Sequence, residues 1–451
     1  MTKPHREISV NAFYCGSPGQ SWAGLWSHPR SNSCDYNTIE FWTQLARTCE
    51  EGLLDGIFVA DALGISDVYK GSPAAILKAG SFVPSMDPML LVPIMAAVTK
   101  HLTFGVTANT TYETPYLLAR RFSTLDHLTR GRVAWNVVTG VLEATSKAVG
   151  LKTWASHDER YLAAEEYMEL MYKFWERSWD DDAAVRDKAS GTFTDPAKVR
   201  AIHHEGKYYH CHGTHLSEPS PQRTPVIFAA GSSPAGMDFL AKHAECGFIS
   251  AGSKESVRKT VQAVREKAVQ HGRRGEDIKI YMGMTIVVAP TEAEARALQQ
   301  EYARHNDLEG NLAFKSGFVG VDFSKYGLDD PLPNQKTNAS QSAMAQYASK
   351  AWRIRDLGLF EPMEGKEVFL VGSSQQVCDQ IVSWVEETGI DGINLIRTVE
   401  PEGLHAFCKL VVPELQNRGV FKTRYREGAM REKLFSSASA RVNVTHPAAK
   451  V

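Results

Sequence analysis

The sequence predicts an α/β fold, a (β/α)8 TIM barrel with long inserted segments. Eight short apolar segments rich in β-branched residues recur along the chain, and most are followed by a stretch of helical periodicity. This alternation is typical of a parallel sheet with helices outside it, and eight strands is the number that closes a barrel. No G-x-G-x-x-G follows the first segment, which disfavours a dinucleotide-binding open sheet.

The individual elements follow from these patterns. The expected strands are 7–14, 56–61, 102–109, 132–138, 225–231, 246–252, 278–288 and 392–397. The expected helices are 37–53, 87–100, 115–128, 158–175, 234–243, 255–271, 292–305 and 375–387. In the first helix Phe41, Leu45 and Cys49 form one apolar stripe, which predicts the face that packs on the barrel.

Three long segments interrupt the alternation, near residues 62–86, 179–223 and 307–365. We expect them to be insertions in a single barrel domain that spans residues 1–451. The second is polar, with an expected strand pair around GKYYHCHGTHL, and the third is rich in Gly, Ser, Asn and Pro. Loops of this length in a compact domain are usually binding loops or lids, so we expect them to cover a site.

Composition excludes several classes of partner. The 50 basic residues are offset by 52 acidic ones, so the chain offers no broad attraction to nucleic acid or to anionic lipid. No apolar run approaches the roughly 18 residues that spanning a membrane requires, and the polar N-terminus does not have the pattern of a signal peptide. Seven cysteines without any C-x-x-C favour a reducing, cytoplasmic location.

Polar side chains recur where the predicted strands end. Asp61 ends the second strand, Thr107 lies near the end of the third, and Asn136 lies near the end of the fourth. Because the carboxyl ends of barrel strands face a shared cleft, we expect these side chains to meet at a binding site.

A second group of residues is suited to an anion. In AAGSSPAG (229–236) a strand leads directly into a helix, with Ser232 and Ser233 at the expected N-cap. Backbone N–H groups at such a helix end bind phosphate well, although ordinary helix capping explains the same residues. In HDERY (157–161) His157 and Tyr161 are four residues apart, which places them on one helix face, as on many solvated helices.

Other site chemistries find less support. The segment IHHEGKYYHCHGTH (202–215) is rich in histidine, but its spacing matches no established zinc motif, so a surface hairpin is the favoured interpretation and no metal site is predicted. Neither the G-x-S-x-G elbow of serine hydrolases nor a P-loop is present.

Taken together, the segments resemble the bacterial-luciferase-like flavin-dependent monooxygenases, in the branch that contains nitrilotriacetate, dibenzothiophene-sulfone, dimethyl-sulfide and long-chain-alkane monooxygenases. The matching stretches run over most of the chain in the order that the family has them. They are GLWSHP (24–29), FVAD with GISDVY (58–69), the run from AAVTKHLTFGVT to NVVT (96–139), HDERY (157–161), EPSPQRTPVIFAAGSS (218–233), GIDGINL (389–395) and VVPELQNRG (411–419).

The resemblance implies the oxygenase component of a two-component FMNH2-dependent monooxygenase, of the kind met in xenobiotic degradation. Reduced FMN would come from a separate NAD(P)H:FMN reductase, and O2 would be activated as a flavin C4a-peroxide. The family pattern implies flavin ring and ribityl contacts for Asp61, Thr107 and Asn136, and phosphate contacts for His157, Tyr161 and Ser233. It also implies a homo-oligomer, either a dimer or a tetramer.

The pocket departs from the family pattern and limits the choice of substrate. Ser66, Val141 and Asn311 stand where the alkane enzyme has Tyr, His and His, and Cys15 is the fourth residue expected in the substrate pocket. No catalytic acid or base is assigned. Because no Arg or Lys cluster is evident, we expect a small apolar substrate: an organosulfur compound, a hydrocarbon or a haloaromatic. The alternative is an F420- or flavin-dependent oxidoreductase on the same barrel that acts without O2.

Overall fold

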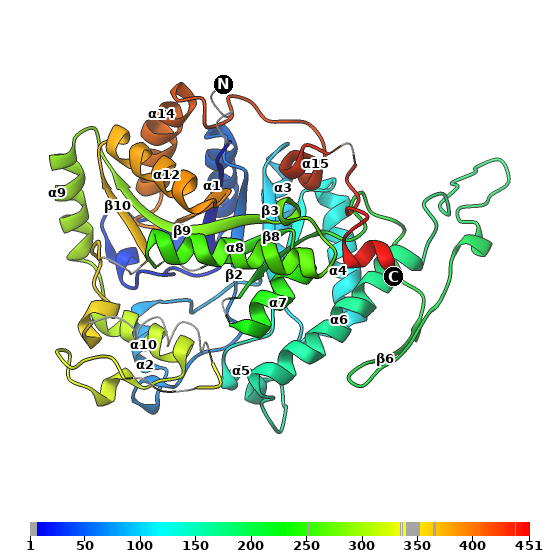
Figure 1. Ribbon diagram of the computed structural model, residues 1–451, viewed down its shortest axis with the longest axis horizontal. Helices are drawn as coiled ribbons and strands as arrows, with labels where there is room; N and C mark the ends of the chain where they lie inside the picture. The colour runs from blue at the N-terminus through cyan, green and yellow to red at the C-terminus, as the bar shows by residue number, and fades with distance from the viewer. Residues whose placement is uncertain are drawn as a thin grey trace.

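The computed structural model describes residues 7–231, 233–249, 252–333, 335, 337–339, 352–363, 367–437 and 439–451. Its centre is a closed barrel of parallel strands (Figure 1). The strands are β1 (Ser9–Cys15), β2 (Gly56–Ala60), β3 (Thr103–Asn109), β4 (Val133–Val138), β7 (Val226–Ala230), β8 (Cys246–Ile249), β9 (Lys279–Val288) and β11 (Gly392–Ile396). Their order is β9-β11-β1-β2-β3-β4-β7-β8, and β8 pairs with β9 to close the ring. All eight predicted strands are confirmed, and with them the TIM barrel.

Helices connect the strands and cover the outside of the barrel (Figure 1). They are α1 (Ile39–Glu51), α3 (Pro88–Ala97), α4 (Pro115–Thr129), α6 (His157–Arg177), α7 (Pro234–His243), α8 (Lys254–Gln270), α9 (Glu292–Ala303) and α12 (Ser374–Thr388), followed after β11 by α13 (Glu402–Ala406), a π-helical turn (Phe407–Val411) and α14 (Val412–Asn417). Short 3-10 turns lie at Leu25–Ser27, Ser33–Asp35, Tyr69–Gly71, Pro196–Lys198, Gly275–Asp277, Phe323–Lys325, Ile354–Leu357 and Pro447–Lys450. The predicted stripe of α1 is buried against the barrel.

One strand was not expected from the sequence. β10 (Val368–Gly372) pairs in parallel with the last residues of β9, Met284–Val288. β8 pairs only with the first residues of β9, from Lys279 to Met282, so the longer β9 extends beyond it. β10 forms hydrogen bonds with backbone groups of β9 that the barrel leaves unpaired. These groups are left unpaired because β9 is longer than its neighbour β8.

The inserted segments carry elements of their own. The first contains α2 (Ala74–Ala79), the third contains α10 (Leu308–Val319), and the two helices pack together, while α5 (Glu143–Ala148) follows β4. α10 was not predicted, because it is buried on most sides and therefore lacks a single apolar stripe. The second segment forms the expected hairpin, β5 (Ile202–Glu205) with β6 (His210–Gly213), which projects away from the barrel (Figure 1).

The C-terminal part of the chain closes one end of the barrel. In α15 (Met430–Phe435), Arg431 forms an ion pair with Glu245, with 2.6 Å between Nε and Oε1, and both side chains are buried. Arg431 also donates to the carbonyl of Thr224, and both Thr224 and Glu245 precede barrel strands. α15 therefore covers the amino-terminal ends of the strands and leaves the carboxyl ends to the site. Within the described residues, no helix is both long and apolar enough to cross a membrane.

Candidate active site

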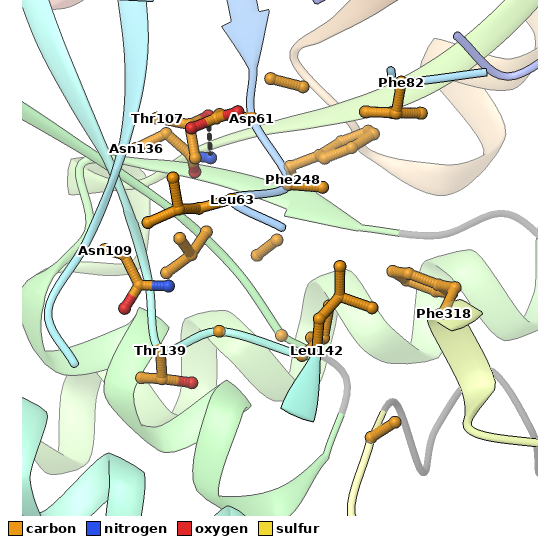
Figure 2. A pocket seen from close by; sticks show the side chains of 18 of the residues that line it. Asp61, Leu63, Phe82, Thr107, Asn109, Asn136, Thr139, Leu142, Phe248 and Phe318 are labelled. Carbon is orange, nitrogen blue, oxygen red and sulfur yellow. Dashed lines mark hydrogen bonds between the residues drawn. The ribbon is translucent and has the colours of Figure 1, made fainter. Parts of the chain in front are cut away.

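A cavity of about 420 Å³ lies at the carboxyl ends of the barrel strands (Figure 2). This volume is in the range of small-molecule sites. Rings from three strands form its floor: Phe13 lies 5.4 Å from Phe58 and 5.6 Å from Phe248, measured between ring centroids. Because these aromatic rings fill the barrel interior, the cavity ends at the top of the packed core.

All six residues expected to bind a cofactor line this one cavity. Asp61 directly follows β2, Thr107 and Asn136 lie in the neighbouring strands β3 and β4, and Figure 2 shows the three close together. The others come from the first turns of two helices, α6 and α7; they are His157, Tyr161 and Ser233. The fold thus places two separate polar groups on the wall of one cavity.

The strand group is built around a buried amide. Thr107 and Asn136 are partners in the β3–β4 register, and Asn136 Nδ2 donates to Thr107 Oγ1 at 2.9 Å. The other end of this amide, Oδ1, is buried and has no hydrogen-bond partner in the described structure. A buried acceptor without a partner is costly, so this oxygen is suited to an N–H or O–H of a ligand.

Asp61 lies directly after β2, at the edge of the same group. Burial, followed by repulsion from Asp87, raises the pKa of its carboxyl to about 6, although the backbone N–H of Ala62 opposes the shift. Around pH 6 this carboxyl therefore exchanges a proton readily while it faces the cavity.

The raised pKa of Asp61 predicts a pH-dependent stability. Because the folded value of about 6 exceeds the ordinary 3.8, the contribution to stability is complete below pH 3.8 and is lost as the pH rises through 6. Asp61→Asn should therefore increase the free energy of unfolding at pH 8 by on the order of 1 kcal/mol, after allowance for partial exposure, and so raise the melting temperature. At pH 4 it should change the melting temperature little.

Thermal denaturation of the flavin-free protein at both pH values measures this effect. Asp67→Asn, at an exposed carboxyl of the same inserted segment, is the matched control. Equal changes in melting temperature for Asp61→Asn at pH 4 and pH 8 would contradict the raised pKa of Asp61.

The helix group lies where α6 and α7 begin. Ser233 is the N-cap of α7 and accepts from the N–H of Gly236, as expected; Ser232 lies outside the described residues. Ser233 Oγ lies 3.4 Å from His157 Nε2, and the rings of His157 and Tyr161 are 5.1 Å apart. A Cβ on Gly236 would come within 2.9 Å of the Tyr161 hydroxyl and 3.0 Å of Ser233 Oγ. Glycine at position 236 therefore leaves room for the Tyr161 and Ser233 hydroxyls beside this helix end.

Two of the three inserted segments cover the cavity. Leu63 and Phe82 come from the first, and Phe314 and Phe318 come from α10 in the third. Phe82 has a φ of 57°, unfavourable for an aromatic residue, and its ring stacks on Phe314 at 4.8 Å. The second segment contributes none of the described lining residues, so the expectation of a cover holds for the first and third alone.

Only one of the four expected substrate-pocket residues lines the cavity, and it is Val141. Cys15 is buried beside the wall, where its thiol contacts Ser17 Oγ at 3.0 Å. Ser66 is buried against Gly317 of α10. Asn311 in α10 accepts from the N–H of Ala23 at 2.9 Å and so ties α10 to the segment after β1. The structure places these three outside the cavity because local packing and backbone contacts hold them elsewhere.

The sequence analysis did not identify the aromatic residues of α10 or the two cations of the wall, Arg160 and Lys315. Lys315 forms an ion pair with Glu367. Arg160 belongs to the HDERY stretch and lies three residues after His157. This spacing could have predicted that the two side chains share a helix face. No group of three or more metal-ligand side chains is found among the described residues.

A family model described as luciferase-like monooxygenase matches residues 21–392. The chain belongs to this family. The dimethyl-sulfide monooxygenase of Hyphomicrobium sulfonivorans is 44% identical over 449 residues, 99% of this chain and 94% of that protein. The crystal structure of that protein gives a TM-score of 0.93 and covers 99% of this chain and 96% of the other.

Two further relatives are similar over almost the whole of this chain. The long-chain alkane monooxygenase of Geobacillus thermodenitrificans is 42% identical over 450 residues, covering 100% of this chain and 98% of that protein. The crystal structure of a riboflavin lyase, with modified FMN and riboflavin, gives a TM-score of 0.92 at 34% identity and covers 99% of both chains. This luciferase-like monooxygenase is therefore a flavin-dependent monooxygenase, and the branch expected from its sequence is confirmed.

Proposed function

We propose that this luciferase-like monooxygenase is the oxygenase component of a two-component system. It takes reduced FMN from a separate NAD(P)H:FMN reductase and uses O2 to oxidise a small apolar compound. The observation that carries the proposal is the division of one cavity into a strand group with an unpartnered amide oxygen and a helix group suited to an anion. These two ends match the polar ring and the phosphate of FMN.

At the strand end, Asn136 Oδ1 would accept a hydrogen bond from a ring N–H of the flavin. The Thr107 hydroxyl already accepts from Asn136, so its own proton is free to donate to a flavin oxygen. Asp61, from the neighbouring strand, holds or releases a proton near pH 6 at this end of the cavity. Together these side chains orient the ring.

At the helix end, Ser233, Tyr161 and His157 would hold the phosphate. Burial raises the pKa of Tyr161, so its hydroxyl remains a donor at neutral pH. The N-terminus of α7 adds the favourable end of a helix dipole. The helix group is suited to a terminal phosphate, which is why we propose FMN and not FAD.

Reduced flavin, when bound, supplies the electrons that activate O2. The chain positions the substrate and excludes water, and the rings of Phe82, Phe314 and Phe318 make that part of the wall apolar. The relatives' names refer to dimethyl sulfide and long-chain alkanes. An organosulfur compound, a hydrocarbon or a haloaromatic fits such a wall.

Anaerobic titration with reduced FMN tests the proposal. Each of Ser233→Ala and Tyr161→Phe removes a hydrogen bond to a charged group, worth about 1.5–3 kcal/mol, so affinity should fall by roughly one order of magnitude or more. Tyr209→Phe is a control, because this tyrosine donates to the carbonyl of Thr110 and does not line the cavity.

Two results would count against the proposal. Tighter binding of F420 than of reduced FMN would support the alternative oxidoreductase. Unchanged affinity in both helix-end variants would place the phosphate elsewhere.

A further inference from the structure

Arg160 lies beside the helix group and carries a buried positive charge. It lies three residues after His157 and directly before Tyr161 in α6, and it lines the cavity although only 2% of its surface is exposed. Within the described part of the chain, no carboxylate forms an ion pair with it.

Neutral groups hold the guanidinium of Arg160 in place. It lies over the ring of Trp154, with 4.5 Å from Cζ to the ring centroid. Its NH1 donates to the carbonyl of Ala155 at 2.8 Å, and its NH2 donates to the carbonyl of Asn338 at 3.1 Å. Nε is buried and has no hydrogen-bond partner in the described structure.

Asn338 ties this arrangement to the start of α6. Its Oδ1 accepts from the backbone N–H of His157 at 2.8 Å, while its own carbonyl accepts from Arg160. Asn338 belongs to the third inserted segment, and the next residue, Ala339, lines the cavity. The charge is thus fixed from two sides, by α6 and by this segment.

A buried charge without a counter-ion is unfavourable, and burial lowers the pKa of this guanidinium. A ligand of opposite charge would remove this cost, and Arg160 lies on the cavity wall, where such a ligand can reach it. The cavity wall next to Arg160 is also where Ser233, Tyr161 and His157 gather.

We propose that Arg160 is the counter-ion of the flavin phosphate and that Trp154, Ala155 and Asn338 position it. The inference rests on the proposed function and deepens it, because it assigns the phosphate's charge partner to a residue outside the three side chains already described. Nε, or a guanidinium N–H released from a carbonyl, donates to a phosphate oxygen. The affinity for a ligand phosphate then depends on the charge of Arg160 as well as on hydrogen bonds.

Comparison of reduced FMN with reduced riboflavin tests the proposal, because the two ligands differ only in the phosphate. Arg160→Met should weaken binding of FMN by roughly 10- to 100-fold, as expected for loss of a charge-assisted hydrogen bond, and leave binding of riboflavin within about twofold. Arg160→Lys should keep most of the preference for FMN, because it keeps the charge. If Arg160→Met does not fold, Arg160→Gln removes the charge and keeps a donor for the carbonyls.

Lys315→Met is the matched control, since Lys315 is the other buried cation of the wall but forms an ion pair with Glu367. It should leave the ratio of FMN to riboflavin affinity unchanged. Equal losses for both ligands in Arg160→Met would show a purely structural role and overturn the proposal, as would unchanged FMN binding. Failure of the wild-type protein to bind either flavin would instead overturn the proposed function.

Discussion

No oxidised product is expected when the purified chain receives NADH, FMN, O2 and an apolar substrate without a reductase, and addition of an FMN reductase should restore product formation. The physical reason is that the sequence has no glycine-rich nucleotide motif after its first strand, and the cavity has one phosphate-suited end. The measurement is product formation, because free reduced flavin consumes NADH and O2 by itself.

Chemically reduced FMN is the control for this experiment. A single addition of it under air should give product without any reductase or NADH, since the chain then needs only the reduced flavin. Steady NADH oxidation by the purified chain alone would show that it binds a nicotinamide and would contradict the two-component proposal.

Uncharged substrates are expected to react at least about 1,000-fold more efficiently, in kcat/KM, than the polycarboxylate nitrilotriacetate. Burial of carboxylates without cationic partners costs several kcal/mol, and about 4 kcal/mol corresponds to this factor. The described wall offers two cations, of which Lys315 pairs with Glu367 and Arg160 lies at the proposed phosphate end. A screen of sulfides, alkanes and haloaromatics with a reductase, read out as product, measures the difference.

The trimethyl ester of nitrilotriacetate provides a control with a similar shape and no carboxylates. If charge decides, the ester should bind and compete with an apolar substrate, while the free acid should not. Comparable kcat/KM values for the acid and for an apolar sulfide would show that the cavity accommodates carboxylates, and the inference of an apolar substrate would fail.

The candidate site shows how far sequence reasoning reaches. Asp61, Thr107 and Asn136 could be predicted because parallel barrel strands expose their carboxyl ends on one face, so residues that end neighbouring strands must approach each other. Ser233 and His157 could be predicted from helix-start patterns and from the family resemblance. Cys15, Ser66 and Asn311 are not on the cavity wall, because tertiary contacts that no periodicity records hold their side chains elsewhere.

The sequence by itself determined the eight barrel strands, eight of the helices that cover them, the family and the six side chains of the two polar groups, because each depends on local periodicity, on a strand end or on an ordered run of motifs. Only the tertiary structure decided which inserted segments cover the cavity, that α10 is a helix, and that Arg160 is buried with no carboxylate partner among the described residues. These features come from packing between segments far apart in the chain, such as Asn338 against α6, and burial and charge balance exist only once those segments meet.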